Sequence, residues 1–198
     1  MGNLIPWDLD FDLRAALNAA AANLPIPTVP ETQAACLDFI VERLRNLLLD
    51  AGYRFDIVDA VVAAQGENPA RAARAVQEMA AWIARDDWST ILPAYARCVR
   101  ITRDLDTGYI VAPEAFQEAA ERALYAALEQ AEAVERGPGS VNDFLQAFTP
   151  LIPAINTFFD DVLVMVDDQA VRQNRLGLLQ RIATLADGVA DMSRLEGF

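Results

Sequence analysis

Residues 37–48 read Leu-Asp-Phe-Ile-Val-Glu-Arg-Leu-Arg-Asn-Leu-Leu, and the spacing of their apolar side chains decides the fold class. The residues that set this spacing are Leu37, Ile40, Val41, Leu44, Leu47 and Leu48. Steps of three and four residues place all of them on one face of an α-helix. Gly52 follows, and glycine is typical of the position just past a helix end. The stretch therefore predicts a long amphipathic helix over residues 31–51.

The same periodicity continues along the chain and predicts an all-α protein, a helical bundle of eight or nine helices. Prolines, glycines and short polar residues separate the helices. We expect them at residues 8–23, 31–51, 53–64, 69–85, 89–103, 113–135, 140–148 and 155–161, with a last long helix that Asp167 or Asp168 caps and whose inward stripe reaches Met192. Short connections favour antiparallel neighbours.

The composition agrees with a helical protein outside the membrane. Hydrophobic residues make up 54% of the 198 residues, alanine and leucine dominate, and only 9 residues are glycine. The longest apolar runs are too short to span a bilayer, and the first residues do not resemble a signal peptide. We therefore expect a cytoplasmic protein with no membrane partner. Cys36 and Cys98 are expected to be small buried residues in a reducing compartment, with a disulfide as the lesser alternative.

Several residues and motifs that are typical of catalytic sites are missing. The chain has no histidine, which removes the histidine general base, the Ser–His pair and the histidine metal ligand. It also has no cysteine cluster for zinc and no glycine-rich phosphate loop. Three pairs of adjacent aspartates, at residues 86–87, 160–161 and 167–168, do not face each other on a helix. We therefore predict no catalytic residue, no metal site and no cofactor within this chain.

The arginines carry the remaining functional signal. The net charge of −13 argues against a general nucleic-acid binder, and no DNA partner is expected. All 16 basic residues are arginine, and two stretches contain arginine without any acid. Residues 94–103 hold Arg97, Arg100 and Arg103 beside Tyr95, and residues 169–186 hold Arg172, Arg175 and Arg181. Arginine beside an aromatic ring suits the phosphates and unpaired bases of RNA. Alternatively, these arginines pair internally with Asp160, Asp161 or Asp187.

The region near the C-terminus carries a resemblance to a known family. Residues 158–179 read Phe-Phe-Asp-Asp-Val-Leu-Val-Met-Val-Asp-Asp-Gln-Ala-Val-Arg-Gln-Asn-Arg-Leu-Gly-Leu-Leu, and residues 189–195 read Val-Ala-Asp-Met-Ser-Arg-Leu. Together they resemble the C-terminal end of the bacterial glycyl-tRNA synthetase β subunit, and residues 39–63 resemble an earlier part of its late region. The resemblance implies a DALR-type anticodon-binding domain over residues 89–198. Residues 31–88 would be a helical body segment, and residues 1–30 an N-terminal helix with a proline-rich linker.

The resemblance also implies that tRNA binding and catalysis belong to different subunits. In that family the β subunit supplies tRNA binding, whereas the α subunit binds glycine and catalyses the ligation, for which the whole enzyme uses ATP and Mg²⁺. The implied partners of this chain are tRNA and the α subunit. Two rival interpretations stay open at this point. One is the same domain type in an arginyl-tRNA synthetase, and the other is a helical scaffold for subunit assembly, which the charge of −13 favours.

The family motifs match this chain in part. In the motif Lys-Arg-Val-x-Asn-Ile, Arg97 carries over, whereas Ala96 and Arg100 replace the lysine and the asparagine. In the motif Pro-Val-Asp-x-Phe-Phe, Ala154 and Asn156 replace the proline and the aspartate. The motif Arg-x-Asn-Arg is complete. We therefore predict RNA contact by seven residues, namely Tyr95, Arg97, Arg100, Arg103, Arg172, Asn174 and Arg175.

Overall fold

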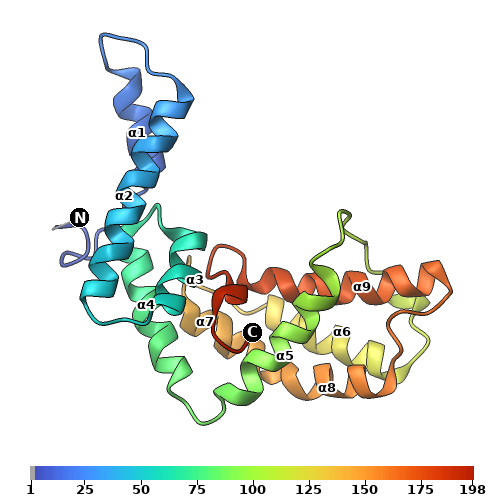
Figure 1. Ribbon diagram of the computed structural model, residues 1–198. Coiled ribbons are helices and arrows are strands. Elements are labelled where there is room, and N and C mark those ends of the chain that lie inside the picture. The colour runs from blue at the N-terminus through green and yellow to red at the C-terminus, as the bar shows by residue number, and fades with distance from the viewer. Residues whose placement is uncertain (1–2) are drawn as a thin grey trace. The chain divides into compact units, whose positions relative to one another are not determined.

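The computed structural model describes residues 3–198, which contain nine α-helices and no strand (Figure 1). The all-α class and the number of helices that the sequence predicts are confirmed. Contacts group the chain into two compact units. Unit 1 holds the described residues up to Ala84, together with Pro138–Val141 and Gly188–Glu196. Unit 2 holds Arg85–Gly137, Asn142–Asp187 and Gly197–Phe198. Unit 1 therefore includes two segments from later in the chain.

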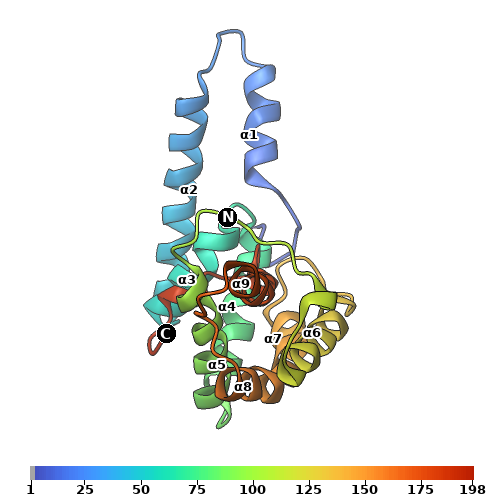
Figure 2. The same ribbon diagram turned by 90° about the vertical axis from the view of Figure 1, so that its right-hand side faces the viewer.

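Unit 1 is built on a helical hairpin. Helices α1 (Leu13–Ala22) and α2 (Pro30–Asp50) lie side by side and are joined at one end (Figure 2). Helices α3 (Phe55–Gln65) and α4 (Pro69–Ile83) pack on each other, and the short 3-10 turn η4 (Met192–Arg194) packs on α3. The core of this unit includes the fully buried side chains of Leu44, Val58, Val61, Val76 and Met79.

Local sequence signals set several helix ends in unit 1. Asn68 caps α4, because its side chain accepts a hydrogen bond of 3.2 Å from the backbone N–H of Arg71, and Pro69 occupies the first helical position. Gly52 follows α2 with a φ of +93°, a conformation that favours glycine. The sequence predicted Gly52 as the residue just past the end of this helix, and that prediction is confirmed.

Unit 2 contains α5 (Trp88–Thr102), α6 (Ala119–Glu132), most of α7 (Val141–Phe148), α8 (Ile152–Asp161) and α9 (Gln169–Ala183). A 3-10 turn, η2 (Thr149–Leu151), joins α7 to α8. Helix α5 packs on α9 and α8, and α6 packs on α8. The fully buried large side chains of this unit include Leu124, Leu128, Phe144, Phe148, Phe158 and Leu178. Each such side chain contributes about 1.5–3 kcal/mol by its burial.

Two helices of unit 2 are shorter than predicted. Residues 113–118 are not the start of a long helix, because Pro113–Ala115 form a 3-10 turn, η1, and α6 begins only at Ala119. The reason is a reciprocal capping box between Glu118 and Glu121, which fixes the helix start. Helix α9 ends at Ala183 rather than near residue 192. The chain leaves the helix there, because residues Thr184–Ala186 form a 3-10 turn, η3, and Gly188 has a φ of +70°.

Three further predictions about helix ends and burial were wrong. The first helix begins at Leu13 instead of residue 8, because Asp12 caps it. Leu47 was expected on the buried face of its helix, but its side chain is about half exposed. Cys36 is exposed, whereas Cys98 is buried as predicted, and burial raises the pKa of the Cys98 thiol to about 12. Both cysteines are free.

In the described residues, no helix has the length and the apolar character needed to cross a membrane.

Candidate functional site

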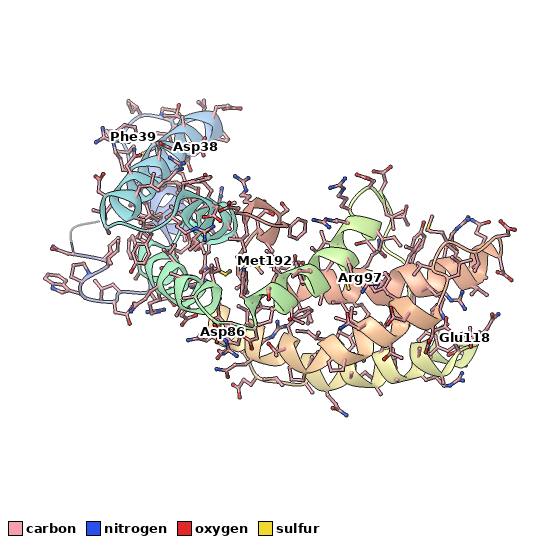
Figure 3. All side chains as sticks on the ribbon, turned by 60° about the horizontal axis from the view of Figure 1, so that its bottom comes forward. Asp38, Phe39, Asp86, Arg97, Glu118 and Met192 are labelled. Carbon is pink, nitrogen blue, oxygen red and sulfur yellow. The ribbon has the colours of Figure 1, made fainter. Side chains whose placement is uncertain are left out.

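Arg97 has a defined environment on α5 (Figure 3). Its guanidinium carbon lies 4.3 Å from the ring centre of Phe159, and its Nη1 donates a long hydrogen bond of 3.5 Å to Oδ1 of Asn156. Both partners belong to α8. No ion pair within residues 3–198 involves Arg97. A ring orients the guanidinium without cancelling its charge, so donors of Arg97 stay available to an anion.

Arg100 and Arg103 are the exposed members of the same arginine row. The guanidinium of Arg100 lies 5.5 Å from the ring centre of Phe198. Arg103 lies 3.7 Å from the carboxylate of Asp104, but both side chains are largely in solvent. A contact of that kind is weak and is screened by salt. Helix α5 and its C-cap residue Arg103 therefore present three guanidinium groups, two of them beside aromatic rings.

The sequence did not single out the aromatic partners of this row. Asn156 and Phe159 are three positions apart on α8, a spacing that places both on one helix face and could have indicated a joint role. Phe198 gave no comparable signal, because its contact with Arg100 joins residues far apart in the chain.

Tyr95 lies in the core of unit 2 and is almost fully buried. Its hydroxyl donates a hydrogen bond of 2.6 Å to the backbone carbonyl of Ala183. Its ring packs edge-to-face against Phe144 and Phe148, with ring centres 5.8 and 5.5 Å away. A nucleobase cannot reach a ring that is covered in this way, so we leave Tyr95 out of the proposed RNA contacts.

Arg175 was predicted as an RNA contact, with an internal ion pair as the alternative. Its side chain is 5% exposed, and its Nε donates a hydrogen bond of 2.7 Å to Oε1 of Glu121, which is 1% exposed. The expected internal partners, Asp160 and Asp161, were the wrong carboxylates. Glu121 also accepts hydrogen bonds from the backbone N–H groups of Gln117 and Glu118, at 2.7 and 2.6 Å. Burial alone would raise the pKa of Glu121, but these hydrogen bonds hold it below its ordinary value.

Arg172 and Asn174 bind backbone instead of facing solvent freely. The half-buried Arg172 donates a hydrogen bond of 3.2 Å to the carbonyl of Val166. The buried Asn174 accepts from the N–H of Ala112 at 2.8 Å and donates to the carbonyl of Ala112 at 3.0 Å. Gln180 makes the same kind of contact with the N–H of Tyr109 and the carbonyl of Thr107, both at 2.9 Å. Helix α9 therefore holds two loops through its polar side chains.

Replacing Asn174 by alanine is expected to destabilise the protein by about 1–3 kcal/mol, because both backbone groups of Ala112 lose their partner. Urea unfolding measures this difference. Gln169→Ala is the matched control on the same helix, and an exposed side chain of that kind should change stability by less than about 0.5 kcal/mol. Equal losses in the two variants would contradict the role assigned to Asn174.

Several acidic residues of the chain cap helices or form ion pairs. Asp168 caps α9, as predicted, and accepts hydrogen bonds from the N–H groups of Ala170 and Val171 at 2.9 and 3.1 Å. Asp87 occupies the N-cap position of α5 without a side-chain hydrogen bond to the helix, and its carboxylate binds Arg85 at 2.6 Å. In the part of the chain that the structure describes, no group of three or more histidine, cysteine, aspartate or glutamate residues could hold a metal ion.

A groove of about 650 Å³ lies in unit 1, away from the arginines of α5 in sequence. Its lining is mostly apolar and includes Leu47, Tyr53, Ala70, Ala73 and Arg74. None of the seven residues predicted to contact RNA lines it. The candidate RNA-binding surface is instead the row of cations along α5 and at its C-terminal end.

Comparison with known proteins shows which family this chain resembles. Residues 91–190 match the DALR anticodon binding domain. The chain is 35% identical to the glycine–tRNA ligase β subunit of Moorella thermoacetica and 37% identical to that of Citrifermentans bemidjiense, over 96% and 94% of its own length. It is 32% identical to the chloroplastic/mitochondrial glycine–tRNA ligase 2 of Arabidopsis thaliana. The matches span 29%, 27% and 18% of these relatives, so the chain corresponds to less than a third of each. The resemblance predicted from the sequence is confirmed.

Proposed function

Because this chain belongs to the DALR anticodon-binding domain family, we propose that it binds tRNA through unit 2, as part of a glycyl-tRNA synthetase β subunit. The observation that carries this proposal is the row of Arg97, Arg100 and Arg103 on α5 and at its C-cap, which lies inside the matched residues 91–190. The names of the relatives favour glycine over arginine as the amino acid of the enzyme.

The mechanism that we propose combines phosphate pairing with stacking. Arg97 and Arg100 would bind phosphates of an unpaired loop, because the rings beside them leave their charges uncompensated. Phe159 and Phe198 would offer aromatic edges or faces to splayed bases. The chain would act in the cytoplasm together with the α subunit, which would bind glycine, ATP and Mg²⁺ and catalyse the ligation.

The double variant Arg97→Ala/Arg100→Ala is expected to bind a glycine tRNA transcript about 10-fold more weakly, because two phosphate contacts are lost. The slope of log affinity against log salt should flatten by roughly 1.4, or about 0.7 per contact with single-stranded RNA. Binding titrations over a salt series measure both quantities, and thermal melts verify that the variant is folded.

Arg194→Ala is the matched control for the loss of an arginine. Arg194 is exposed and pairs with Asp191 in unit 1, so its removal should leave the salt slope unchanged and cost less than about 1 kcal/mol of stability. If the double variant kept the wild-type affinity and slope, the proposed surface would be wrong.

A further inference from the structure

Residues 162–168, which connect α8 to α9, present two large apolar side chains to solvent. This connection is the orange segment between the two helices in Figure 1. Val162 and Val164 are buried, whereas Leu163 is 71% exposed and Met165 is 58% exposed. Alternation of this kind belongs to an extended segment that buries one side and displays the other. Leu163 and Met165 therefore point away from the core of unit 2.

Two arginines of α9 hold this segment in place from within. Arg175 donates a hydrogen bond of 2.9 Å to the carbonyl of Leu163, and Arg172 donates one of 3.2 Å to the carbonyl of Val166. Arg175 is itself fixed by its buried ion pair with Glu121. A surface ordered in advance loses little conformational entropy on binding. The two apolar side chains are therefore displayed on a preorganised backbone.

Carboxylates flank the two apolar side chains on both sides. Asp160 and Asp161 precede the segment, Asp167 and Asp168 end it, and all four are exposed. No ion pair among the described residues involves Asp160, Asp161 or Asp167. Such a rim repels the phosphates of RNA, whereas it complements lysine or arginine on a protein. The charge therefore selects a protein rather than a nucleic acid as the occupant.

We propose that Leu163 and Met165 form a docking surface for the α subunit, which would cover them with an apolar recess rimmed by lysine or arginine. The proposal rests on the proposed function, because it takes the α subunit as the partner. It assigns protein assembly and tRNA binding to different parts of unit 2, the α8–α9 connection and the arginine row of α5. A partially apolar centre inside a charged rim is the usual arrangement of a protein interface.

The test uses the full 198-residue chain with the purified α subunit in one arm and glycine tRNA in the other. Leu163→Ser/Met165→Ser is expected to weaken binding of the α subunit by about 10- to 100-fold, as for central interface side chains, and to leave tRNA affinity unchanged. Ile26→Ser, which removes an equally exposed apolar side chain from unit 1, should bind both partners like the wild type.

The variant Asp160→Asn/Asp161→Asn removes two carboxylates of the rim. It is expected to change the affinities for the α subunit and for tRNA differently. It should weaken binding of the α subunit and flatten its salt dependence, while tRNA binding stays the same or strengthens. Failure of the wild-type chain to bind the α subunit, or undiminished binding by the Leu163/Met165 variant, would overturn the proposal. A loss of tRNA affinity in that variant would instead identify the surface as an RNA contact. Docking without any tRNA binding would refute only the proposed tRNA function.

Discussion

Replacing Arg175 by methionine is expected to destabilise the protein by about 3–5 kcal/mol, because the change strands the buried carboxylate of Glu121. Methionine fills much of the space of the arginine stem, so the loss reports mainly on the ion pair and on the carbonyl of Leu163. Urea unfolding at pH 7 measures the difference. Arg172→Met is the matched control on the same helix, and it should cost much less because Arg172 has no buried carboxylate partner.

The pH dependence identifies Glu121 as the cause of this loss. The folded-state pKa of Glu121 lies below its unfolded value, so its contribution to wild-type stability is full above about pH 4.3 and is lost as the pH falls through the folded pKa. In Arg175→Met the stranded carboxylate gains by taking up a proton. The stability difference between variant and wild type should therefore shrink between pH 7 and pH 4. A constant difference over that range would show that the ion pair is not responsible.

This variant also separates structure from RNA binding. If Arg175 acts only inside the fold, the folded fraction of Arg175→Met should bind tRNA with the wild-type salt slope. A flattened slope in a variant of unchanged stability would instead place Arg175 among the phosphate contacts.

Replacing Asp56 by alanine is expected to destabilise the protein by about 2–4 kcal/mol. The change removes charge-assisted hydrogen bonds and a negative charge from the first turn of α3. Asp56 is 2% exposed and accepts hydrogen bonds from Arg54 at 2.7 and 3.1 Å. It also accepts one of 3.0 Å from the N–H of Glu196, which ties the C-terminal segment Gly188–Glu196 to α3 within unit 1. Urea unfolding gives the loss, and hydrogen exchange should show faster exchange of the Glu196 amide.

Glu196→Ala is the control for this prediction, because Glu196 pairs with the same arginine but is mostly in solvent. It should cost less than about 1 kcal/mol. Burial alone would raise the pKa of Asp56, but the hydrogen bonds from Glu196 and Arg54 hold it below its ordinary value. The stability that Asp56 provides is therefore present above about pH 3.9 and lost below it. Equal losses in the two variants would contradict a special role of the buried carboxylate.

The sequence by itself determined the fold class and most helix positions. The spacing of Leu37, Leu44 and Leu48 requires a helix, and Asn68 and Asp168 cap the helices that follow them. These features depend on residues within a turn or two of each other, so local physics is sufficient to predict them. The motif at residues 158–179 likewise identified the family. The absence of histidine from the chain argued against a histidine-based catalytic site.

Only the tertiary structure decided what each arginine does. Arg97 and Arg175 both lie in stretches without acid, and the sequence analysis predicted both as RNA contacts. In the fold, Arg97 lies over an aromatic ring without a carboxylate, whereas Arg175 is buried against Glu121, which is 54 positions away. The cost of burying a charge depends on which residues the packing of distant helices brings beside it. That packing, and not the local pattern, separates the arginines that can bind RNA from those that hold the protein together.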